Sequence, residues 1–288
     1  MSSNLPRTAL ASWPHEEHAE LTQLGHQLRG RRVCVLTGAG ISTDSGIPDY
    51  RSPDRPPRTR PPIQHREFVQ SADMRQRYWA RSALGWPRFR AFEPNATHHA
   101  LARWEASGTL TPLLTQNVDR LHQKAGHREA LELHGALERV VCLACRAVDS
   151  RDRLQSRFVE TNARVLAAEY AVLPDGDVDL PDDLVRDFVV PACETCGGVL
   201  MPDVVFFGGN VPKERVDAAF ASLDAADWLL VLGSSLTVFS GYRFVLRAVA
   251  QGKPVAIVNR GPTRGDAHAT VRLELGVAEA LAVLAPLP

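Results

Sequence analysis

The chain has 288 residues, of which 44% are hydrophobic, enough to build one large domain with an insertion or two modest domains. Lysine and arginine together number 33, as do aspartate and glutamate, so the overall charge does not favour binding to nucleic acid or to an anionic membrane surface. We therefore expect a globular protein that meets charged partners only locally.

The first 23 residues lack the apolar core of a signal peptide and contain Trp13, Pro14, Glu16, Glu17 and Glu20. No stretch reaches the roughly 18 to 20 consecutive apolar residues that a membrane span needs. We expect residues 1–23 to be an N-terminal extension, and the protein to be cytoplasmic with no membrane partner.

Four apolar runs end abruptly in small or polar residues, at 31–40, 110–119, 227–236 and 253–261. Runs that are apolar on both faces are typical of a parallel sheet covered by helices on both sides. Helical patterns lie between them at 98–108 and 213–226, where Pro94 and Asn95 would open the first helix and Gly108 would close it. The predicted fold is α/β, a Rossmann-like parallel sheet with helices on both faces.

The carboxyl ends of parallel strands share one edge of a sheet, and open α/β sheets bind ligands there. The loops that follow the four runs, at 38–51, 116–119, 233–235 and 259, are therefore predicted to form one site.

The loop GAGISTDSGIPDYR at 38–51 is rich in glycine, so its backbone N–H groups could approach a diphosphate, and a helix starting there would add a favourable dipole. The spacing is not that of a hydride-transfer enzyme, and the acidic residue expected about 20 positions later is replaced by a proline-rich segment. Hydride transfer therefore loses support. A plain turn with Ser42 or Ser45 as a helix cap is the alternative.

Two stretches interrupt the alternating pattern. Residues 53–93 begin with five prolines and continue into an aromatic-rich helical part, which predicts an inserted helical cap. Residues 141–203 form a second insertion, within which the acidic and turn-rich stretch 174–183 is expected to be an exposed loop. The predicted division is a Rossmann-like domain over 24–140 and 204–288 and a small domain over 141–203.

Two C-x-x-C pairs bracket the second insertion, Cys142 with Cys145 and Cys193 with Cys196. Two such pairs can supply the tetrahedral four-sulfur site that Zn²⁺ prefers. Because four thiolates leave no position for water, we predict one structural zinc ion, with a redox pair as the alternative. Cys34, within an apolar run, is expected to pack in the core.

Seven motifs, in order, resemble the sirtuins, a family of NAD-dependent protein deacylases. They are GAGISTDSGIPDYR (38–51), TQNVD (115–119), LHG (133–135), the two C-x-x-C pairs, PDVVFFG (202–208), GSSL (233–236) and VNRG (258–261). Residues 62–89 further resemble the class II branch, which includes a mitochondrial sirtuin with lipoamidase and ADP-ribosyl transfer activities.

In sirtuins the amide oxygen of an acyl-lysine attacks the nicotinamide ribose, nicotinamide departs, and a ribose hydroxyl then takes the acyl group. The resemblance therefore implies that NAD is consumed and that acyl-lysine proteins or peptides are the substrates. Mono-ADP-ribosyl transfer to protein and a non-catalytic zinc-ribbon module that binds NAD stay open as alternatives. We expect a monomer with no nucleic-acid partner.

By the same resemblance, His134 is the general base for the ribose hydroxyl, a task that suits an imidazole pKa near 6.5. Asn117 and Gln116 would hold ribose hydroxyls, and Asp119 and Ile47 would line the nicotinamide pocket. The other NAD contacts implied are Gly38, Ala39, Gly40, Asp49, Tyr50, Arg51, Gly233, Ser234, Ser235, Asn259, Arg260, Gly261 and Val277. Helix-surface or capping roles are expected for the remaining histidines, among them His98, His99, His122 and His127.

A substrate edge is implied as well, because the segment after Asp203 resembles the one to which sirtuin substrates add as a strand. Its residues are Val204, Val205, Phe206, Phe207 and Gly208. Many sirtuins have a glutamate next, where this chain has Gly209. Tyr78 and Arg81 match a Tyr-x-x-Arg pair that binds acidic acyl groups, since arginine can hold a carboxylate bidentately; ordinary cap-helix residues are the alternative.

Overall fold

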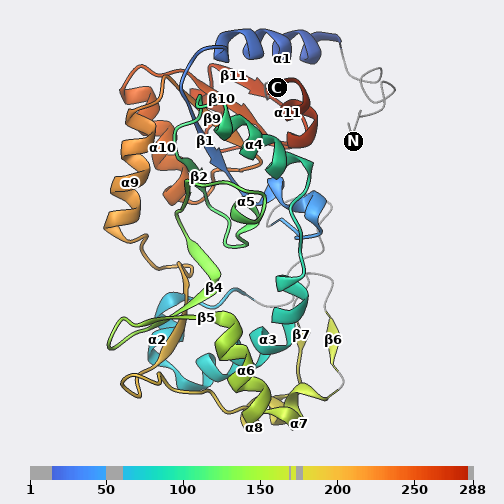
Figure 1. Ribbon diagram of the computed structural model, residues 1–288, viewed down its shortest axis with the longest axis vertical. Coiled ribbons are helices and arrows are strands. Elements are labelled where there is room, and N and C mark those ends of the chain that lie inside the picture. Colours follow the sequence, from blue (N-terminus) through green and yellow to red (C-terminus); the bar gives the residue numbers. More distant parts are fainter. Residues whose placement is uncertain (1–14, 50–60, 169, 173–177, 285–288) are drawn as a thin grey trace.

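The computed structural model describes residues 15–49, 61–168, 170–172 and 178–284. Figure 1 shows these residues as two bodies, the larger built on a six-stranded sheet and the smaller on a three-stranded sheet. Within the described part of the chain, no helix combines the length and the apolar character that crossing a membrane would require.

The sheet of the larger body is parallel throughout, with the strand order β11-β10-β9-β1-β2-β3. Read from β3 and numbered along the chain, this is the 3-2-1-4-5-6 order of a Rossmann fold. The predicted fold class is confirmed. The strands are β1 (Val33–Thr37), β2 (Leu113–Thr115), β3 (Ala130–Glu132), β9 (Trp228–Leu232), β10 (Val255–Val258) and β11 (Val271–Leu273).

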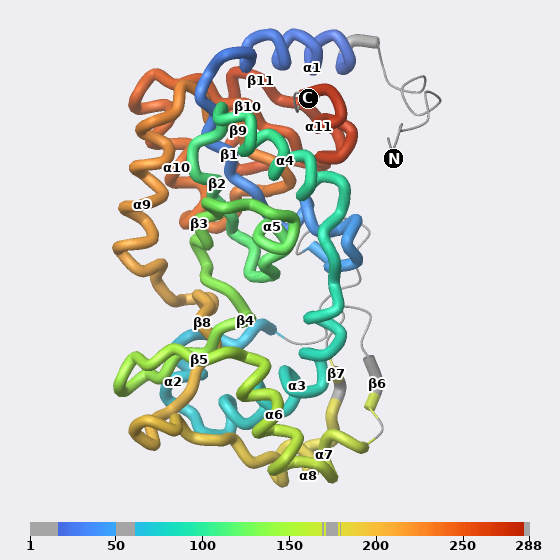
Figure 2. The backbone as a smooth tube through the Cα atoms, in the orientation of Figure 1, coloured from blue at the N-terminus to red at the C-terminus, as the bar shows by residue number. Residues whose placement is uncertain are grey.

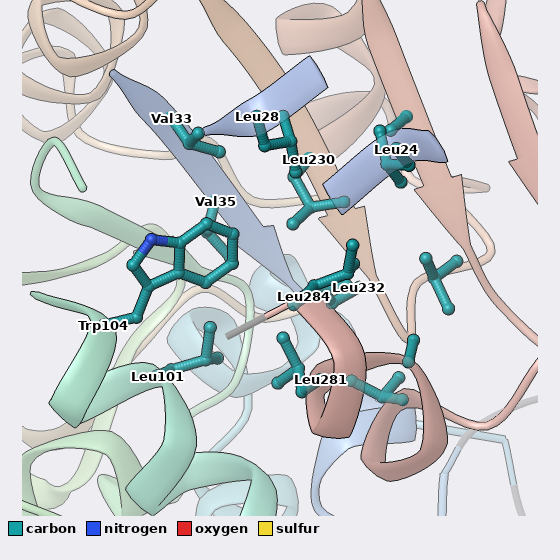
Figure 3. Close-up of a cluster of buried hydrophobic side chains, with 14 of the residues drawn as sticks. Leu24, Leu28, Val33, Val35, Leu101, Trp104, Leu230, Leu232, Leu281 and Leu284 are labelled. Carbon is teal, nitrogen blue, oxygen red and sulfur yellow. The ribbon is translucent and has the colours of Figure 1, made fainter. Parts of the chain in front are cut away.

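Helices cover both faces of this sheet because alternate strand residues point to opposite sides. Val35 and Leu230 face α1 (His15–Leu28), α4 (Ala96–Ala106) and α11 (Val277–Leu284), in the cluster that Figure 3 shows. Leu36 and Val231 face α9 (Lys213–Asp224) and α10 (Phe239–Ala250). The central strands are therefore buried on both sides, which explains their unbroken apolar runs.

Both predicted helices are present, and the first is closed at both ends by the residues expected to do so. The side chain of Asn95 accepts hydrogen bonds from the N–H groups of Thr97 and His98 at the start of α4. Gly108 has φ +78°, which suits a residue without a side chain just after a helix.

The smaller body joins both predicted insertions around one core. Its antiparallel sheet has the order β5-β4-β8, and Phe68 and Trp79 of the first insertion share a buried cluster with Phe158 and Met201 of the second. The chain reaches this body twice, as the tube in Figure 2 shows. The elements are β4 (Gly135–Cys142), β5 (Val148–Ser150), β8 (Leu200–Val204), α2 (His65–Gln70), α3 (Ala72–Arg90), α6 (Arg151–Thr161), α7 (Ala163–Leu166), α8 (Asp182–Asp187), and the strand pair β6 (Ala171–Val172) with β7 (Val178–Asp179).

The expectation of an exposed loop over 174–183 is right for the exposed residues 181–183 but wrong for Val178 and Leu180. Val178 and Leu180 are buried in the core of the smaller body, and α8 begins at Asp182. The acidic residues misled the prediction because they alternate with apolar residues that point inward. Residues 174–177 lie outside the described part of the chain.

Three of the histidines expected on helix surfaces or at caps are buried together between α4 and the short helix α5 (Leu121–Lys124). The ring of His122 lies 5.0 Å from that of His98 and 5.1 Å from that of His127. His98 is also part of the capping box of α4, so the capping expectation was right for this residue. Burial lowers the pKa of all three side chains, that of His98 to about 4.

These histidines predict a loss of stability in acid. Unfolded histidines titrate near pH 6.5, so the unfolded state binds protons first as the pH falls. The stability that the neutral rings contribute is complete above about pH 6.5 and is lost toward pH 4, by up to about 3 kcal/mol for His98. Urea unfolding between pH 8 and 5 should show a weaker pH dependence for His98→Gln than for His99→Gln, which changes an exposed neighbour. Equal pH dependence would contradict this assignment.

Candidate active site

The loops after β1 and β9 meet at the point where the order of strand addition reverses. The chain leaves β1 toward β2 and β3, and later returns to β9 on the other side of β1, which is where an open α/β sheet forms a ligand crevice. The N–H of Gly38 donates to the carbonyl of Leu232 and that of Gly40 to Gly233, at 3.1 and 2.9 Å. A Cβ on Gly38 would lie 2.6 Å from that of Ser234, so this approach requires glycine.

The loop after β1 lacks the predicted helix over its described residues. Two short 3₁₀ helices, Ala39–Ile41 and Thr43–Ser45, follow Gly38 instead, so no helix dipole of useful length points at the crevice. Ser42 does not cap a helix with its side chain but donates from its hydroxyl to a carboxylate oxygen of Asp119 at 2.7 Å. Ile47 and Asp49 lie in the irregular stretch that follows, whereas Tyr50 and Arg51 lie outside the described residues.

A polar network ties the loop after β2 to both neighbouring loops. The amide of Asn117 donates to the carbonyl of Gly38 and to the hydroxyl of Ser42, both at 3.1 Å. The amide of Gln116 donates to the hydroxyl of Ser234 at 2.7 Å. Burial raises the pKa of Asp119, although Leu121 N–H and Ser42 donate to its carboxylate and oppose the shift. The structure thus brings the residues predicted at 38–49, 116–119 and 233–235 to one place.

His134 lies between the two bodies, immediately before β4. Its Nδ1 is 2.8 Å from the carbonyl oxygen of Gln116, which holds the ring beside the polar network. Burial lowers the pKa of His134, and Arg243 and Arg215 lower it further, while the Gln116 carbonyl opposes them. The imidazole is therefore kept neutral, the form that can accept a proton.

Gly135 sets the position of this histidine because β4 and β8 come together there. Its φ is +78°, and an added Cβ would lie 1.9 Å from the carbonyl oxygen of Asp203. We expect Gly135→Ala to lower the free energy of unfolding by at least about 2 kcal/mol, from the positive φ and the clash together. Gly252→Ala is the control, since Gly252 has φ +66° with nothing within 4 Å of an added Cβ. Equal decreases in the free energy of unfolding for the two variants, measured by urea titration, would show that the structure relieves the clash at residue 135.

The predicted residues in the loop after β10, the neighbour of β9, bond mainly within that loop and to α11. The Asn259 amide donates to the carbonyl oxygens of Arg260 and Gly261, at 2.8 and 3.0 Å. Arg260 pairs with Glu279 of α11 at 3.4 Å. Val277 begins α11, and its side chain is buried in the core. In the loop after β9, the hydroxyl of Ser235 lies 3.1 Å from that of Thr237.

The predicted substrate segment runs directly beside His134. The N–H of Val205 donates to the backbone carbonyl of His134 at 2.9 Å, and Val204 is in register with Gly135. Phe206 stacks on Phe68, with 5.0 Å between ring centroids, and meets the edge of Tyr78 at 5.4 Å. The ring of Tyr78, on α3, therefore contacts this segment through Phe206.

Beyond Phe206, the segment turns outward. Phe207 is 41% exposed and its carbonyl accepts from His65 N–H, and Gly208 follows with φ +74°. Arg81 lies three residues after Tyr78 on α3 and is half-buried.

The four predicted metal ligands form one cluster in the smaller body. The sulfurs of Cys142, Cys145, Cys193 and Cys196 all lie within 4.8 Å of one another. Two pairs are 3.5 and 3.8 Å apart, close to the roughly 3.8 Å expected between thiolates around a tetrahedral zinc and too far for disulfides.

Both knuckles of this cluster have the geometry that zinc ligands require. The residue after each second cysteine has a positive φ, +64° at Arg146 and +70° at Gly197. The backbone N–H of Cys145 lowers the pKa of Cys142 to about 6, while the neighbouring sulfurs raise that of Cys145 to about 12, so the thiols share their protons unequally. A Cβ on Gly198 would lie 2.9 Å from the sulfur of Cys142, so glycine is needed there. The cluster can hold one structural zinc with no open position.

Sequence reasoning missed Ser240, whose hydroxyl lies 2.7 Å from Nε2 of His134. It also missed Ser42 as a partner of Asp119 and Asn117. Ser240 follows the GSSL loop at the same edge of the sheet. This position could have indicated that Ser240 lies near the site, but not that it contacts His134. The separation of 106 positions between Ser240 and His134 conceals the pair in the sequence.

Comparisons with known proteins agree with one another. The Sir2 family model matches residues 38–240. An "NAD-dependent protein deacetylase" of Xanthomonas axonopodis pv. citri (strain 306) is 53% identical over 89% of this chain and 87% of that protein. The "NAD-dependent protein lipoamidase sirtuin-4, mitochondrial" of Homo sapiens is 51% identical over 89% of this chain and 82% of that protein. A solved structure, "Sir2-p53 peptide-NAD+", matches with a TM-score of 0.71 and 29% identity, over 94% of this chain and 96% of that one.

Proposed function

The chain belongs to the Sir2 family, and we infer that it is an NAD-dependent protein deacylase that acts on acylated lysine side chains of proteins or peptides. The acyl group passes to ADP-ribose and nicotinamide is released. The observation that carries this inference is the neutral imidazole of His134, fixed between the crevice at the sheet edge and the segment that begins at Val204.

His134 is the general base in this proposal. A carbonyl oxygen can only accept a hydrogen bond, so Nδ1 of the ring is protonated and donates to the carbonyl oxygen of Gln116. In the neutral ring, Nε2 is therefore the basic nitrogen. The ring can take a proton from a ribose hydroxyl at Nε2, which makes that hydroxyl a nucleophile toward the acyl carbon.

The polar network around Asn117 binds the cofactor in this proposal. NAD supplies a ribose carbon that nicotinamide can leave, and the chain supplies groups that hold the diphosphate, the riboses and the carboxamide. The N–H of Ala39 and the hydroxyls of the serines after β9 would be the donors at the switch point of the sheet. Gly38 and Gly40, whose own N–H groups bond to Leu232 and Gly233, let the two loops come close enough for this. Asn117 and Gln116 orient ribose hydroxyls without adding charge, and Asp119 accepts from the carboxamide.

Tyr78 and Phe206 form one wall of the acyl pocket in this proposal, because their rings meet beside the segment that would pair with the substrate backbone. Arg81, on the same helix, would favour acyl groups that end in a carboxylate. Residues Val204 to Gly208 would supply the strand edge.

We also propose that 24–140 with 204–288 is the NAD-binding domain, that 53–93 is a helical cap inserted in its sequence and packed on the smaller body, and that 141–203 is the zinc-binding domain. The one structural zinc holds the smaller body together and takes no part in the chemistry. We propose that the chain acts as a monomer. Free cysteines suit a reducing compartment such as the cytoplasm.

The test is a panel of one peptide carrying acetyl, succinyl, glutaryl, lipoyl or long-chain acyl lysine, incubated with and without NAD. Mass spectrometry of the peptide should show loss of at least one acyl group only when NAD is present. ADP-ribose attached to protein, with every acyl-lysine intact, would favour an ADP-ribosyltransferase instead.

A further inference from the structure

The first turn of α10 closes over His134 and the residue that holds it. The hydroxyl oxygen of Ser240 lies 2.7 Å from Nε2 of the imidazole. At the next residue, an added Cβ on Gly241 would lie 2.5 Å from the amide oxygen of Gln116, so the helix can come this close only because that residue is glycine. The same turn therefore contacts the imidazole and the side chain of Gln116.

The directions of the two hydrogen bonds on this ring follow from the groups involved. The Gln116 carbonyl oxygen, 2.8 Å from Nδ1, can only accept, so Nδ1 carries the ring proton. Nε2 of the neutral ring then has a lone pair, and the hydroxyl of Ser240 must donate to it. Both nitrogens are thus engaged, and the ring is fixed in one tautomer and one orientation.

We propose that Ser240 is a positioning residue for the general base, whose hydroxyl holds Nε2 of His134 in one orientation until the ribose hydroxyl replaces it as the donor to that nitrogen. This inference rests on the proposed function, in which that nitrogen is the proton acceptor. The ribose O–H bond breaks, the Nε2–H bond forms, and the electron pair left on the ribose oxygen attacks the acyl carbon. Ser240 keeps its own proton, which turns away from Nε2 when the ribose O–H donates there.

A hydroxyl suits this position because it can both donate and accept. It donates to the neutral ring and, after rotation about its C–O bond, can accept from the protonated ring, so it can hold the ring through the change in charge. The surroundings make this useful. Arg243, one turn later on α10, and Arg215 of α9 both disfavour a positive charge on the imidazole. An acceptor at Nε2 offsets part of that penalty at the moment of proton transfer.

The test measures cleavage of the nicotinamide bond, which precedes the action of the base, separately from acyl transfer, which requires the base. Exchange of labelled nicotinamide into NAD reports cleavage of the nicotinamide bond, and formation of acyl-ADP-ribose reports the later transfer. Ser240→Ala is expected to lower the rate of acyl transfer about 10- to 100-fold at saturating peptide and NAD, while exchange stays within about twofold. Ser240→Thr, which keeps a hydroxyl, should recover most of the loss.

Ser156→Ala is the matched control, since it removes an exposed helix hydroxyl on α6 that donates only to its own helix, to the carbonyl of Asp152. Both rates should stay unchanged in this variant. Acyl transfer at the normal rate in Ser240→Ala, or an equal loss in both steps, would overturn the inference.

A second measurement uses the protein without NAD or peptide. The imidazole ¹⁵N resonances of His134, identified by their absence in His134→Ala, should show a protonated Nδ1 and a hydrogen-bonded Nε2. The Nε2 resonance should shift in Ser240→Ala and stay in place in Ser156→Ala. An Nε2 resonance unaffected by Ser240→Ala would overturn the contact. Failure of the unsubstituted protein to deacylate would instead overturn the proposed function, so the two failures are distinguishable.

Discussion

Replacing His134 by alanine is expected to lower the rate of acyl transfer by about 10²- to 10⁴-fold while the protein stays folded. A general base contributes rate enhancement of this size, and the imidazole is held at both nitrogens without belonging to a hydrophobic core. Steady-state formation of deacylated peptide, measured at saturating NAD, checks the loss. Nicotinamide exchange should persist, because bond cleavage precedes the step that the base assists.

The control for this variant is His26→Ala, which removes an exposed histidine from α1, on the larger body. It should retain the full rate. Thermal unfolding of both variants near that of the unsubstituted protein would exclude a folding defect. Undiminished acyl transfer by His134→Ala would refute the assignment of the base.

Removing zinc, or replacing Cys193 by serine, is expected to unfold the smaller body. Structural zinc contributes about 10 kcal/mol or more in small zinc modules, comparable with the whole stability of a domain. Cys142 and Cys193 also belong to the buried cluster that joins the two insertions, so loss of the metal would loosen Phe68 and Trp79 as well. Hydrogen exchange should therefore accelerate in both 61–90 and 140–204, and deacylation should fall with it.

Cys34→Ala is the matched control for the metal. Cys34 is buried in the larger body, away from the cluster, and burial raises the pKa of its thiol to about 11, so it is not a competing ligand. This variant should keep one zinc per chain by elemental analysis. Unchanged hydrogen exchange and activity after verified metal removal would show that the fold does not depend on zinc.

The parts of the fold that the sequence predicted well are those with a repeated local signal. Buried strands such as β1 and β9 are apolar on both faces, and Asn95 and Gly108 mark the ends of α4 by their own chemistry. The strands β3 and β11 have only three residues each and are only partly buried, so no apolar run marked them. The shared core of the two insertions depends on contacts between Trp79 and Phe158, which no pattern along the chain reveals.

The candidate site divides in the same way. The cysteine pairs are close in sequence, and the loops 38–49, 116–119 and 233–235 follow strands, so topology alone brings them together. The helix expected after Gly38 is absent because the loop turns through two 3₁₀ helices and its serine bonds to Asp119. Ser240 could not be predicted because a contact between α10 and the start of β4 is a property of the packed molecule.

The most direct measurement is the fate of the acyl group in the reaction of the unsubstituted protein with NAD and the acyl-lysine peptide that it prefers. We predict that each deacylated lysine appears with one nicotinamide and one acyl-ADP-ribose, identified by mass in the small-molecule fraction. Release of the acyl group as a free acid from the start of the reaction, with NAD intact, would contradict the proposed chemistry.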